Sequence, residues 1–263
     1  MTVRRFLKAG ASLLALVSLL GGSAVAQASD DLATILGSKV VRVGAVSAAP
    51  WYLKDLRSNQ WTGLVPDLVQ AVFQGSGVSI DYVDTQWGTA VAGLQSDRFD
   101  LLGGFNKTPE RAKAVDFSRP IGSHRMGVLT LEQDTSRYQS WDSINQASIR
   151  LAAIDGSAAA TLLQPRLDKT QWVIVPSSDA MQLEVESGRA NAFLTNDIQM
   201  AQYVAKRGRG HIIYPLPVQS QATNFGLRKD REAFRAWLDK RLDELDKNGT
   251  LARIWAHYVP TGK

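Results

Sequence analysis

The sequence contains no cysteine and only three histidines. Without cysteine the chain forms no disulfide, no thiolate metal site and no lipid-modified cysteine anchor. The three histidines, His124, His211 and His257, lie far apart and in no ligand spacing. We therefore expect no metal site and no cofactor, and we assign all three histidines to surface or packing roles.

Motifs for nucleotide binding and for nucleophilic hydrolysis are missing as well. The chain has no Gly-x-Gly-x-x-Gly, no phosphate-binding loop ending in Lys-Ser/Thr, and no Gly-x-Ser-x-Gly turn. Each of these motifs places glycines or a nucleophile where the chemistry requires them. Their absence leaves dinucleotide, phosphoryl-transfer and serine-hydrolase functions without support.

The first residues have the pattern of an export signal. Three basic residues precede an apolar run at 11–20, and small residues lead to Ala26 and Ala28. We expect a signal peptide at 1–28, cleaved after Ala26 or Ala28, and a periplasmic protein exported by the general secretory route. No second apolar stretch of membrane-spanning length follows. Loss of the leader leaves 27 basic and 25 acidic residues, a charge balance that gives no case for nucleic acid.

The stretch from Phe99 to Pro120 organises the rest of the chain. A buried strand ends near Leu102 in a glycine pair, and Thr108-Pro109-Glu110 then begins a short helix. Threonine caps a helix, proline suits its first position, and glutamate suits the positive end of its dipole. A cation such as Arg111 is disfavoured in this first turn. Either an anion faces Arg111, or Arg111 pairs at the surface with Glu110 or Asp116.

Strands and helices alternate along the mature chain, which predicts βαβ units and parallel sheets. A second helix start suited to an anion follows a buried strand at Asp155-Gly156-Ser157. The expected elements of the first series are a helix at 31–37, a strand at 40–45, a hairpin with its return strand at 61–65, a helix from Pro66, a strand at 79–83, a helix at 89–96 and a strand at 99–102. Those of the second are strands at 149–154, 172–175 and 192–194 and helices at 158–163, 179–186 and 197–206.

Two similar lobes fit this order better than one continuous sheet, because residues 96–102 and 187–193 echo each other. Extended segments at 123–131 and 221–227 predict a hinge through which the chain enters the second lobe and returns. Helices at 232–248 and up to about Val259 are expected to pack on the first lobe. The predicted boundaries are 29–123 with 222–263 for lobe 1, and 124–221 for lobe 2.

Several short motifs carry a family resemblance. The most specific is Thr108–Ser118, and the others are Val41–Gly44, Pro50-Trp51, Gly63–Leu68 and Asn248–Leu251. With these motifs the mature chain resembles the periplasmic solute-binding proteins of bacterial ABC uptake systems, in the polar amino acid family (family 3). The resemblance implies an α/β fold of two Rossmann-like lobes joined by a two-strand hinge, similar to type II periplasmic binding proteins. It also implies a non-catalytic monomer that closes on a small carboxylate-bearing solute, an amino acid or analogue, and delivers it to an ABC permease in the inner membrane.

The resemblance also implies a ligand site. In it, Arg111 holds the α-carboxylate of the ligand with help from Ser157, an aromatic side chain near Trp51 packs on the ligand, and Asn106 replaces a ligand-contacting serine or threonine. Trp51 and Trp87 have lobe packing as an alternative role. The full set of candidate ligand-binding residues is Trp51, Trp87, Gly104, Phe105, Asn106, Arg111, Ser157, Asn196 and Asp197.

One departure from the family pattern concerns the ligand ammonium group. The family places an aspartate where this chain has Asn196, whose amide oxygen accepts a hydrogen bond but supplies no counter-charge. Asp197 is the available substitute, and simple helix capping is the alternative role for both residues. The resemblance therefore implies a carboxylate in the ligand and leaves an ammonium group open.

The same scaffold also resembles cyclohexadienyl dehydratases, which act on prephenate or arogenate. Such an enzyme needs a general acid close to the departing hydroxyl. In the segment after Thr195, only Asp197 can supply that acid. A carbon-oxygen lyase is therefore the alternative to a binding protein.

Overall fold

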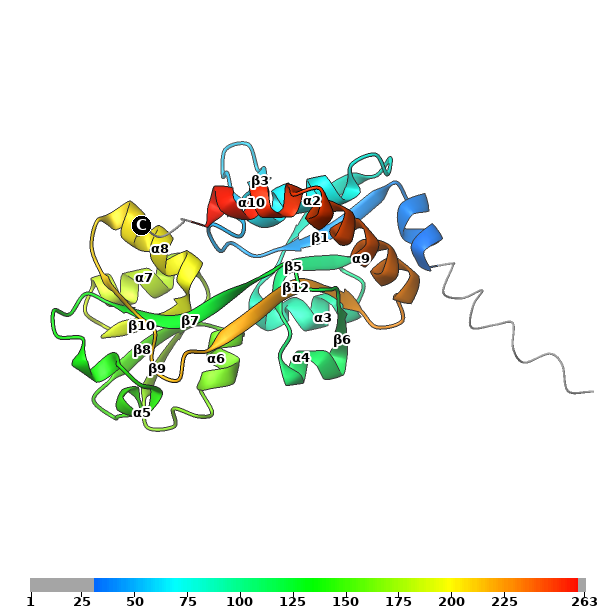
Figure 1. Cartoon of the computed structure of the whole chain (residues 1–263). Helices are drawn as coiled ribbons and strands as arrows, with labels where there is room; N and C mark the ends of the chain where they lie inside the picture. Colours follow the sequence, from blue (N-terminus) through cyan, green and yellow to red (C-terminus); the bar gives the residue numbers. More distant parts are fainter. Residues whose placement is uncertain (1–30, 260–263) are drawn as a thin grey trace, which may run out of the picture.

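A computed structural model describes residues 31–259 of the chain (Figure 1). The predicted signal peptide at 1–28 lies outside the described residues. In chain order the elements are a helix at 31–37, β1 (Val40–Ala45), β2 (Leu53–Lys54), β3 (Trp61–Thr62), α2 (Leu64–Phe73), β4 (Ser79–Asp84), η1 (Trp87–Thr89), α3 (Ala90–Gln95), β5 (Leu101–Asn106), α4 (Pro109–Ala114), β6 (Val115–Phe117), β7 (Gly122–Thr130), η2 (Ser136–Tyr138), α5 (Trp141–Ile144), β8 (Arg150–Ile154), α6 (Ala158–Leu163), β9 (Gln171–Val175), α7 (Ser178–Glu186), β10 (Ala192–Asn196), α8 (Asp197–Arg207), β11 (His211–Ile213), β12 (Ser220–Arg228), α9 (Glu232–Lys247) and α10 (Thr250–Tyr258).

The strands follow the order β4-β1-β5-β12-β7-β10-β8-β9. Parallel pairs lie at both ends of this order, with β1 between β4 and β5, and β8 between β9 and β10. In the middle, β7 and β12 pair with each other in antiparallel register, Ser220 opposite Arg125 and Thr223 opposite Gly122. Figure 1 shows β7 and β12 as the long arrows that join two groups of helices. The predicted fold class, two α/β lobes joined by two strands, is confirmed.

The hinge strands belong to both lobes. Because β7 and β12 pair with each other and with strands on either side, the strand order continues from one lobe into the other. The sequence favours two lobes over one continuous sheet, and the structure combines both features. The predicted lobe boundaries fall inside β7 and β12, and we keep them as a proposal.

The C-terminal helices cover the first lobe, as predicted. Helix α9 buries Phe234, Leu238, Leu242 and Leu245, which recur at helical spacing and join the same apolar cluster as α2 and β1. Helix α10 packs against α2 and α9. Burying a large apolar side chain stabilises a fold by about 1.5–3 kcal/mol, so this face of α9 ties the chain end to lobe 1. None of the helices within residues 31–259 is both long and apolar enough to cross a membrane.

The structure shifts several predicted boundaries, and the shifts of β5 and α2 bear on the site. Strand β5 continues through its glycine pair to Asn106, four residues beyond the predicted end, because it stays paired with β12 up to that residue. Helix α2 begins at Leu64 instead of Pro66. Its first backbone N–H groups donate to the carbonyls of Pro50 and Trp51, which satisfies groups that a helix start leaves free.

Candidate functional site

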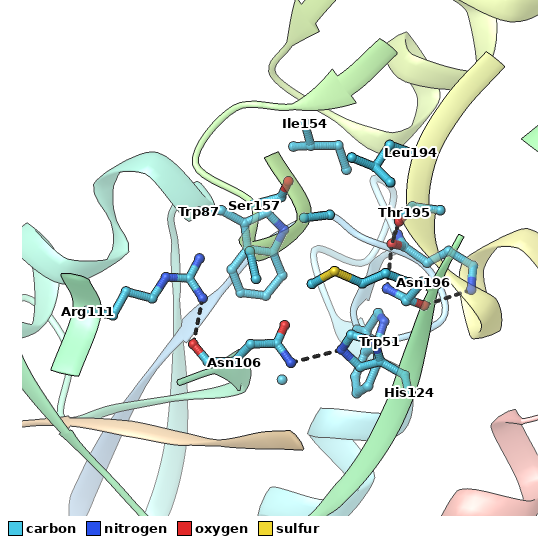
Figure 2. A pocket seen from close by; sticks show the side chains of 15 residues that line it. Trp51, Trp87, Asn106, Arg111, His124, Ile154, Ser157, Leu194, Thr195 and Asn196 are labelled. Carbon is cyan, nitrogen blue, oxygen red and sulfur yellow. Dashed lines mark hydrogen bonds between the residues drawn. The ribbon is translucent and has the colours of Figure 1, made fainter. Parts of the chain in front are cut away.

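A cavity of about 40 Å³ lies between the two lobes (Figure 2). Lobe 1 contributes its β5, α4 and aromatic-loop side chains, lobe 2 contributes the starts of α6 and α8, and β7 lies between them. The lining residues are Trp51, Trp87, Gly104, Asn106, Arg111, His124, Met126, Ile154, Ser157, Ala158, Ala159, Leu194, Thr195, Asn196 and Gln199.

Arg111 is held in place by its own helix start and by backbone carbonyls. Thr108 caps α4 by accepting a hydrogen bond from the backbone N–H of Arg111 at 3.2 Å, as the sequence predicted. The guanidinium donates to the carbonyl of Asn106 at 2.9 Å and, across the interlobe space, to that of Gly156 at 2.7 Å. It also lies 3.9 Å from the ring centroid of Phe105, a cation–π geometry.

Within residues 31–259 the charge of Arg111 has no acidic partner. Only 7% of the residue is exposed, and burial lowers the pKa of its guanidinium to about 9. The surface pair with Glu110 or Asp116 does not form among the described residues. A buried cation is normally paired because its desolvation is costly. Arg111 is therefore a buried cation in the cavity wall that only backbone carbonyls and the Phe105 ring contact among the described polar and aromatic partners.

His124 fixes the orientation of Asn106. The Asn106 side-chain amide donates to His124 Nε2 at 2.8 Å and to the carbonyl of Ala222 at 2.8 Å, so the imidazole proton lies on Nδ1. Figure 2 shows the Asn106 amide nitrogen directed at His124 and its oxygen directed into the pocket. Burial lowers the pKa of His124 to about 4, which keeps it neutral at pH 7. The expectation of a surface or packing role for His124 was incomplete, since it lines the cavity.

Trp51 is positioned by the loop that meets the start of α2. Gly63 precedes this helix with φ +122°, and a Cβ there would lie 2.7 Å from the carbonyl oxygen of Pro50, so only glycine allows the close approach. Trp51 is 3% exposed and packs edge-on against His124 and Trp255, with ring centroids 5.9 and 5.7 Å away. It is both a packing residue and part of the cavity wall.

Trp87 makes contacts with both lobes. Its ring stacks on Phe105 with centroids 6.2 Å apart and an interplanar angle of 12°. It also packs against the buried apolar clusters of lobe 1 and of lobe 2. Beside it, the backbones of Gly88 and Gly156 touch, because a Cβ on Gly156 would lie 2.3 Å from Gly88 Cα. The two lobes are thus in direct contact in this structure.

The polar groups on the lobe 2 wall bind one another. Ser157 caps α6 by accepting from the N–H of Ala160 at 3.2 Å. Asn196 caps α8 by accepting from the N–H of Gln199 at 3.0 Å. The Gln199 side-chain oxygen in turn accepts from Thr195 and Asn196, and its amide donates to Ser178 at 3.0 Å.

Asp197 takes no part in this wall. Its carboxylate lies 3.2 Å from Arg125 Nε in an ion pair, and it does not line the cavity. Among the described residues no aspartate or glutamate lines the cavity. Capping, the alternative considered for Asn196, is the role that the structure shows for its side chain.

The structure brings seven of the nine candidate residues to one cavity, and leaves Phe105 behind Arg111 and Asp197 outside. The sequence reasoning missed His124, Met126, Ile154, Leu194, Thr195 and Gln199, among others. Some signals were present. His124 and Met126 alternate on a predicted hinge strand, so they share one face, and Gln199 follows Asn196 at the spacing of a helix capping pair.

The family comparison agrees with the fold. The chain matches the model for bacterial extracellular solute-binding proteins, family 3, over residues 41–261, and it belongs to that family. The chain is 23% identical over 231 residues to the L-cystine-binding protein TcyA of Bacillus subtilis, which covers 87% of this chain and 84% of that protein. It is 22% identical over 247 residues to a cyclohexadienyl dehydratase of Pseudomonas aeruginosa, covering 94% of this chain and 92% of that enzyme.

Solved structures place the fold among type II periplasmic binding proteins. The ancestral amino acid-binding protein AncCDT-1, a precursor of cyclohexadienyl dehydratase, superposes with a TM-score of 0.79 at 26% identity, covering 87% of this chain and 99% of that one. An amino acid ABC transporter substrate-binding protein of Streptococcus pneumoniae, bound to L-arginine, gives a TM-score of 0.78 at 21% identity, covering 87% of this chain and 97% of that one. The relatives thus include binding proteins and an enzyme.

Proposed function

We propose that this chain is a periplasmic binding protein that captures a small carboxylate-bearing solute, an amino acid or analogue, between its two lobes. As a monomer, it delivers the solute to an ABC permease in the inner membrane. The observation that carries the proposal is Arg111 in the wall of the interlobe cavity, a buried guanidinium to which the described part of the chain offers no carboxylate. A ligand carboxylate there gains charge-assisted hydrogen bonds and neutralises the desolvated charge.

Capture works by closure of the lobes around the hinge. The solute reaches Arg111 and Asn106 on lobe 1 while the lobes are apart, and the starts of α6 and α8 then close over it. Strands β7 and β12 carry this motion because they are the connections between the lobes. A small change in backbone angles in two strands is enough for hinge closure.

The dehydratase alternative is favoured by the relative from Pseudomonas aeruginosa. Its proposed general acid, Asp197, is paired with Arg125 and lies outside the cavity. The titratable side chains that line the cavity are Arg111 and His124, and a neutral imidazole with a pKa of about 4 is a poor proton donor at pH 7. The binding function is therefore the better supported of the two.

A thermal-shift screen of the ligand-stripped mature protein tests the proposal. The panel contains amino acids, their 2-oxo and 2-hydroxy analogues, dicarboxylates and prephenate, each beside its carboxamide where one exists. A ligand that binds only the folded state raises the melting temperature. We expect at least one carboxylate to raise it and its carboxamide to have no effect. An equal shift with the carboxamide contradicts the proposal, and conversion of bound prephenate to product would establish the enzyme instead.

A further inference from the structure

The cavity has an unequal balance of charge. Arg111 supplies one positive charge, and His124 is neutral because burial lowers its pKa to about 4. None of the described residues that line the cavity supplies a negative charge. A ligand with one net negative charge therefore leaves the closed site neutral. A zwitterionic ligand leaves it with one uncompensated positive charge in a region from which water is largely excluded.

Two carboxylates that follow strands of lobe 2, Asp155 and Asp197, do not line the cavity. Asp197 follows Asn196 in sequence but pairs with Arg125, whose guanidinium is itself held 3.9 Å from the ring centroid of Tyr214. Asp155 is exposed and lies beside Gly88, outside the cavity lining. Neither carboxylate therefore forms part of the cavity wall.

The acceptors on the lobe 2 wall are neutral and already partly occupied. The side-chain oxygens of Ser157, Asn196 and Gln199 already accept from protein groups. An ammonium group presents three donors and a full charge, whereas a hydroxyl presents one donor and no charge. On lobe 1, Asn106 Oδ1 accepts no hydrogen bond from any described residue and points into the cavity (Figure 2). It is an acceptor for one donor.

We infer that the solute is a 2-hydroxy carboxylate, and that the matching amino acids are poor ligands. This inference rests on the proposed function and names the solute class of the same site. Arg111 binds the carboxylate, and Asn106 Oδ1 accepts a hydrogen bond from the hydroxyl. The apolar side chains of Met126, Ile154 and Leu194 line the cavity beside these groups and contact the hydrocarbon part of the ligand.

The orientation of Asn106 supports the hydroxyl over the ammonium. Its amide nitrogen is committed to His124 and to the carbonyl of Ala222, so the side chain cannot flip without losing both hydrogen bonds. The oxygen therefore stays directed at the ligand as an acceptor. A single fixed acceptor satisfies the one donor of a hydroxyl, whereas an ammonium group needs two further acceptors, and a donor left unmet is costly in a buried site.

Calorimetry with matched pairs of ligands tests the inference on the ligand-stripped mature protein. The pairs are L-lactate with L-alanine, L-2-hydroxy-3-methylbutanoate with L-valine, and L-phenyllactate with L-phenylalanine. We expect the hydroxy acid of at least one pair to bind at least 10-fold more tightly than its amino acid. Asn196→Asp adds a carboxylate at the cavity wall at almost constant shape and should reduce or reverse this preference at least 10-fold.

The control variant is Asn59→Asp, which makes the same chemical change at an exposed position between β2 and β3 and should leave the preference unchanged. Tighter binding of the amino acid in the pairs overturns the inference, although the proposed capture of a carboxylate survives. An unchanged preference in Asn196→Asp also overturns it. If no member of any pair binds, the hydroxy acid assignment is wrong, and the wider thermal-shift panel then decides the proposed function separately.

Discussion

The two walls of the cavity differ in how far their polar groups are already hydrogen-bonded within the protein. On lobe 1, Arg111 is buried without a carboxylate, and Asn106 presents a free oxygen to the cavity. On lobe 2, Thr195, Asn196 and Gln199 bind one another, and Gln199 also binds Ser178. The lobe 1 wall therefore has a charge and an acceptor oxygen that are free to bind a ligand, whereas the polar side chains of the lobe 2 wall bind one another.

This difference assigns different work to the lobes. Buried polar groups without a partner lower the stability of the empty protein, and a ligand that pairs with them restores that stability. Most of the binding affinity should therefore come from lobe 1. A satisfied network is rigid and keeps its shape without a ligand. We therefore expect lobe 2 to act mainly by enclosing the ligand. The predictions below test each side of this contrast.

The largest effect is expected from Arg111→Met. Methionine keeps an unbranched side chain of moderate length but removes the charge, so ligand affinity should fall roughly 1,000-fold, about 4 kcal/mol for two charge-assisted hydrogen bonds. The empty variant should be at least as stable as the parent, because the substitution removes a desolvated charge. Calorimetry and denaturant unfolding measure the two quantities.

The matched control is Arg189→Met, which removes an exposed arginine paired with Glu184. It should change stability little, because exposed ion pairs contribute little, and should leave affinity unchanged. Loss of both affinity and stability in Arg111→Met would mean that Arg111 supports the fold, and the contrast between the walls would fail.

The lobe 1 wall was largely predictable because its signals are local. Thr108, Pro109 and Arg111 lie within four residues, so capping rules alone place the arginine at a helix start. The partner of His124 is Asn106, on another strand, and the contact of Gly88 with Gly156 joins residues 68 positions apart. No local pattern encodes such pairs, since they exist only after the lobes meet.

The lobe 2 wall shows a different limit of the sequence. The helix start at Asn196 could be predicted, and capping was one of its two expected roles. Gln199 determines that Asn196 is a cap. Its backbone N–H donates to the Asn196 side-chain oxygen, and its side-chain oxygen accepts from the Asn196 amide nitrogen. In the same way, the ion pair with Arg125, which lies 72 residues earlier in the chain, determines the position of the Asp197 carboxylate. Residue type and spacing therefore predict which roles a side chain can take, but the role that it does take depends on a partner from elsewhere in the chain.

A second, smaller effect is expected on the pH dependence of stability through His124. The contrast between the two walls requires that Arg111 be the one positive charge among the described cavity residues. Burial lowers the pKa of His124 from 6.5 to about 4, although Asp197 acts to raise it. Between these values the unfolded chain binds a proton that the folded chain does not. The contribution of His124 to the free energy of unfolding is therefore fully present above about pH 6.5. It falls by about 3 kcal/mol as the pH falls to about 4.

Denaturant unfolding of His124→Asn between pH 4 and 7 should show a shallower loss of the free energy of unfolding than the parent. His211→Asn, at an exposed position on β11, serves as the control and should keep the parental dependence. Identical curves for the parent and His124→Asn would mean that folding does not shift the pKa of His124. The cavity would then hold a second cation once the pH falls below about 6.5.

The smallest effect is expected from Gly156→Ala, which tests whether lobe 2 acts by enclosure. A Cβ on Gly156 would lie 2.3 Å from both the Cα and the nitrogen of Gly88, so the lobes could not approach as closely. Gly188→Ala is the matched control, because Gly188 shares a positive φ, +73° against +62°, but has nothing within 4 Å of its added Cβ. Both variants should lose about 1 kcal/mol of stability from the left-handed backbone.

Ligand affinity separates the two glycine variants. Hindered closure should weaken binding about 10-fold in Gly156→Ala, whereas Gly188→Ala should bind as the parent does. Calorimetry on both, with the ligand found in the thermal-shift screen, makes the comparison. Equal affinities in the two variants would mean that contact between the lobes contributes nothing to capture. In that case lobe 1 alone would hold the solute, and enclosure would have to be removed from the role of lobe 2.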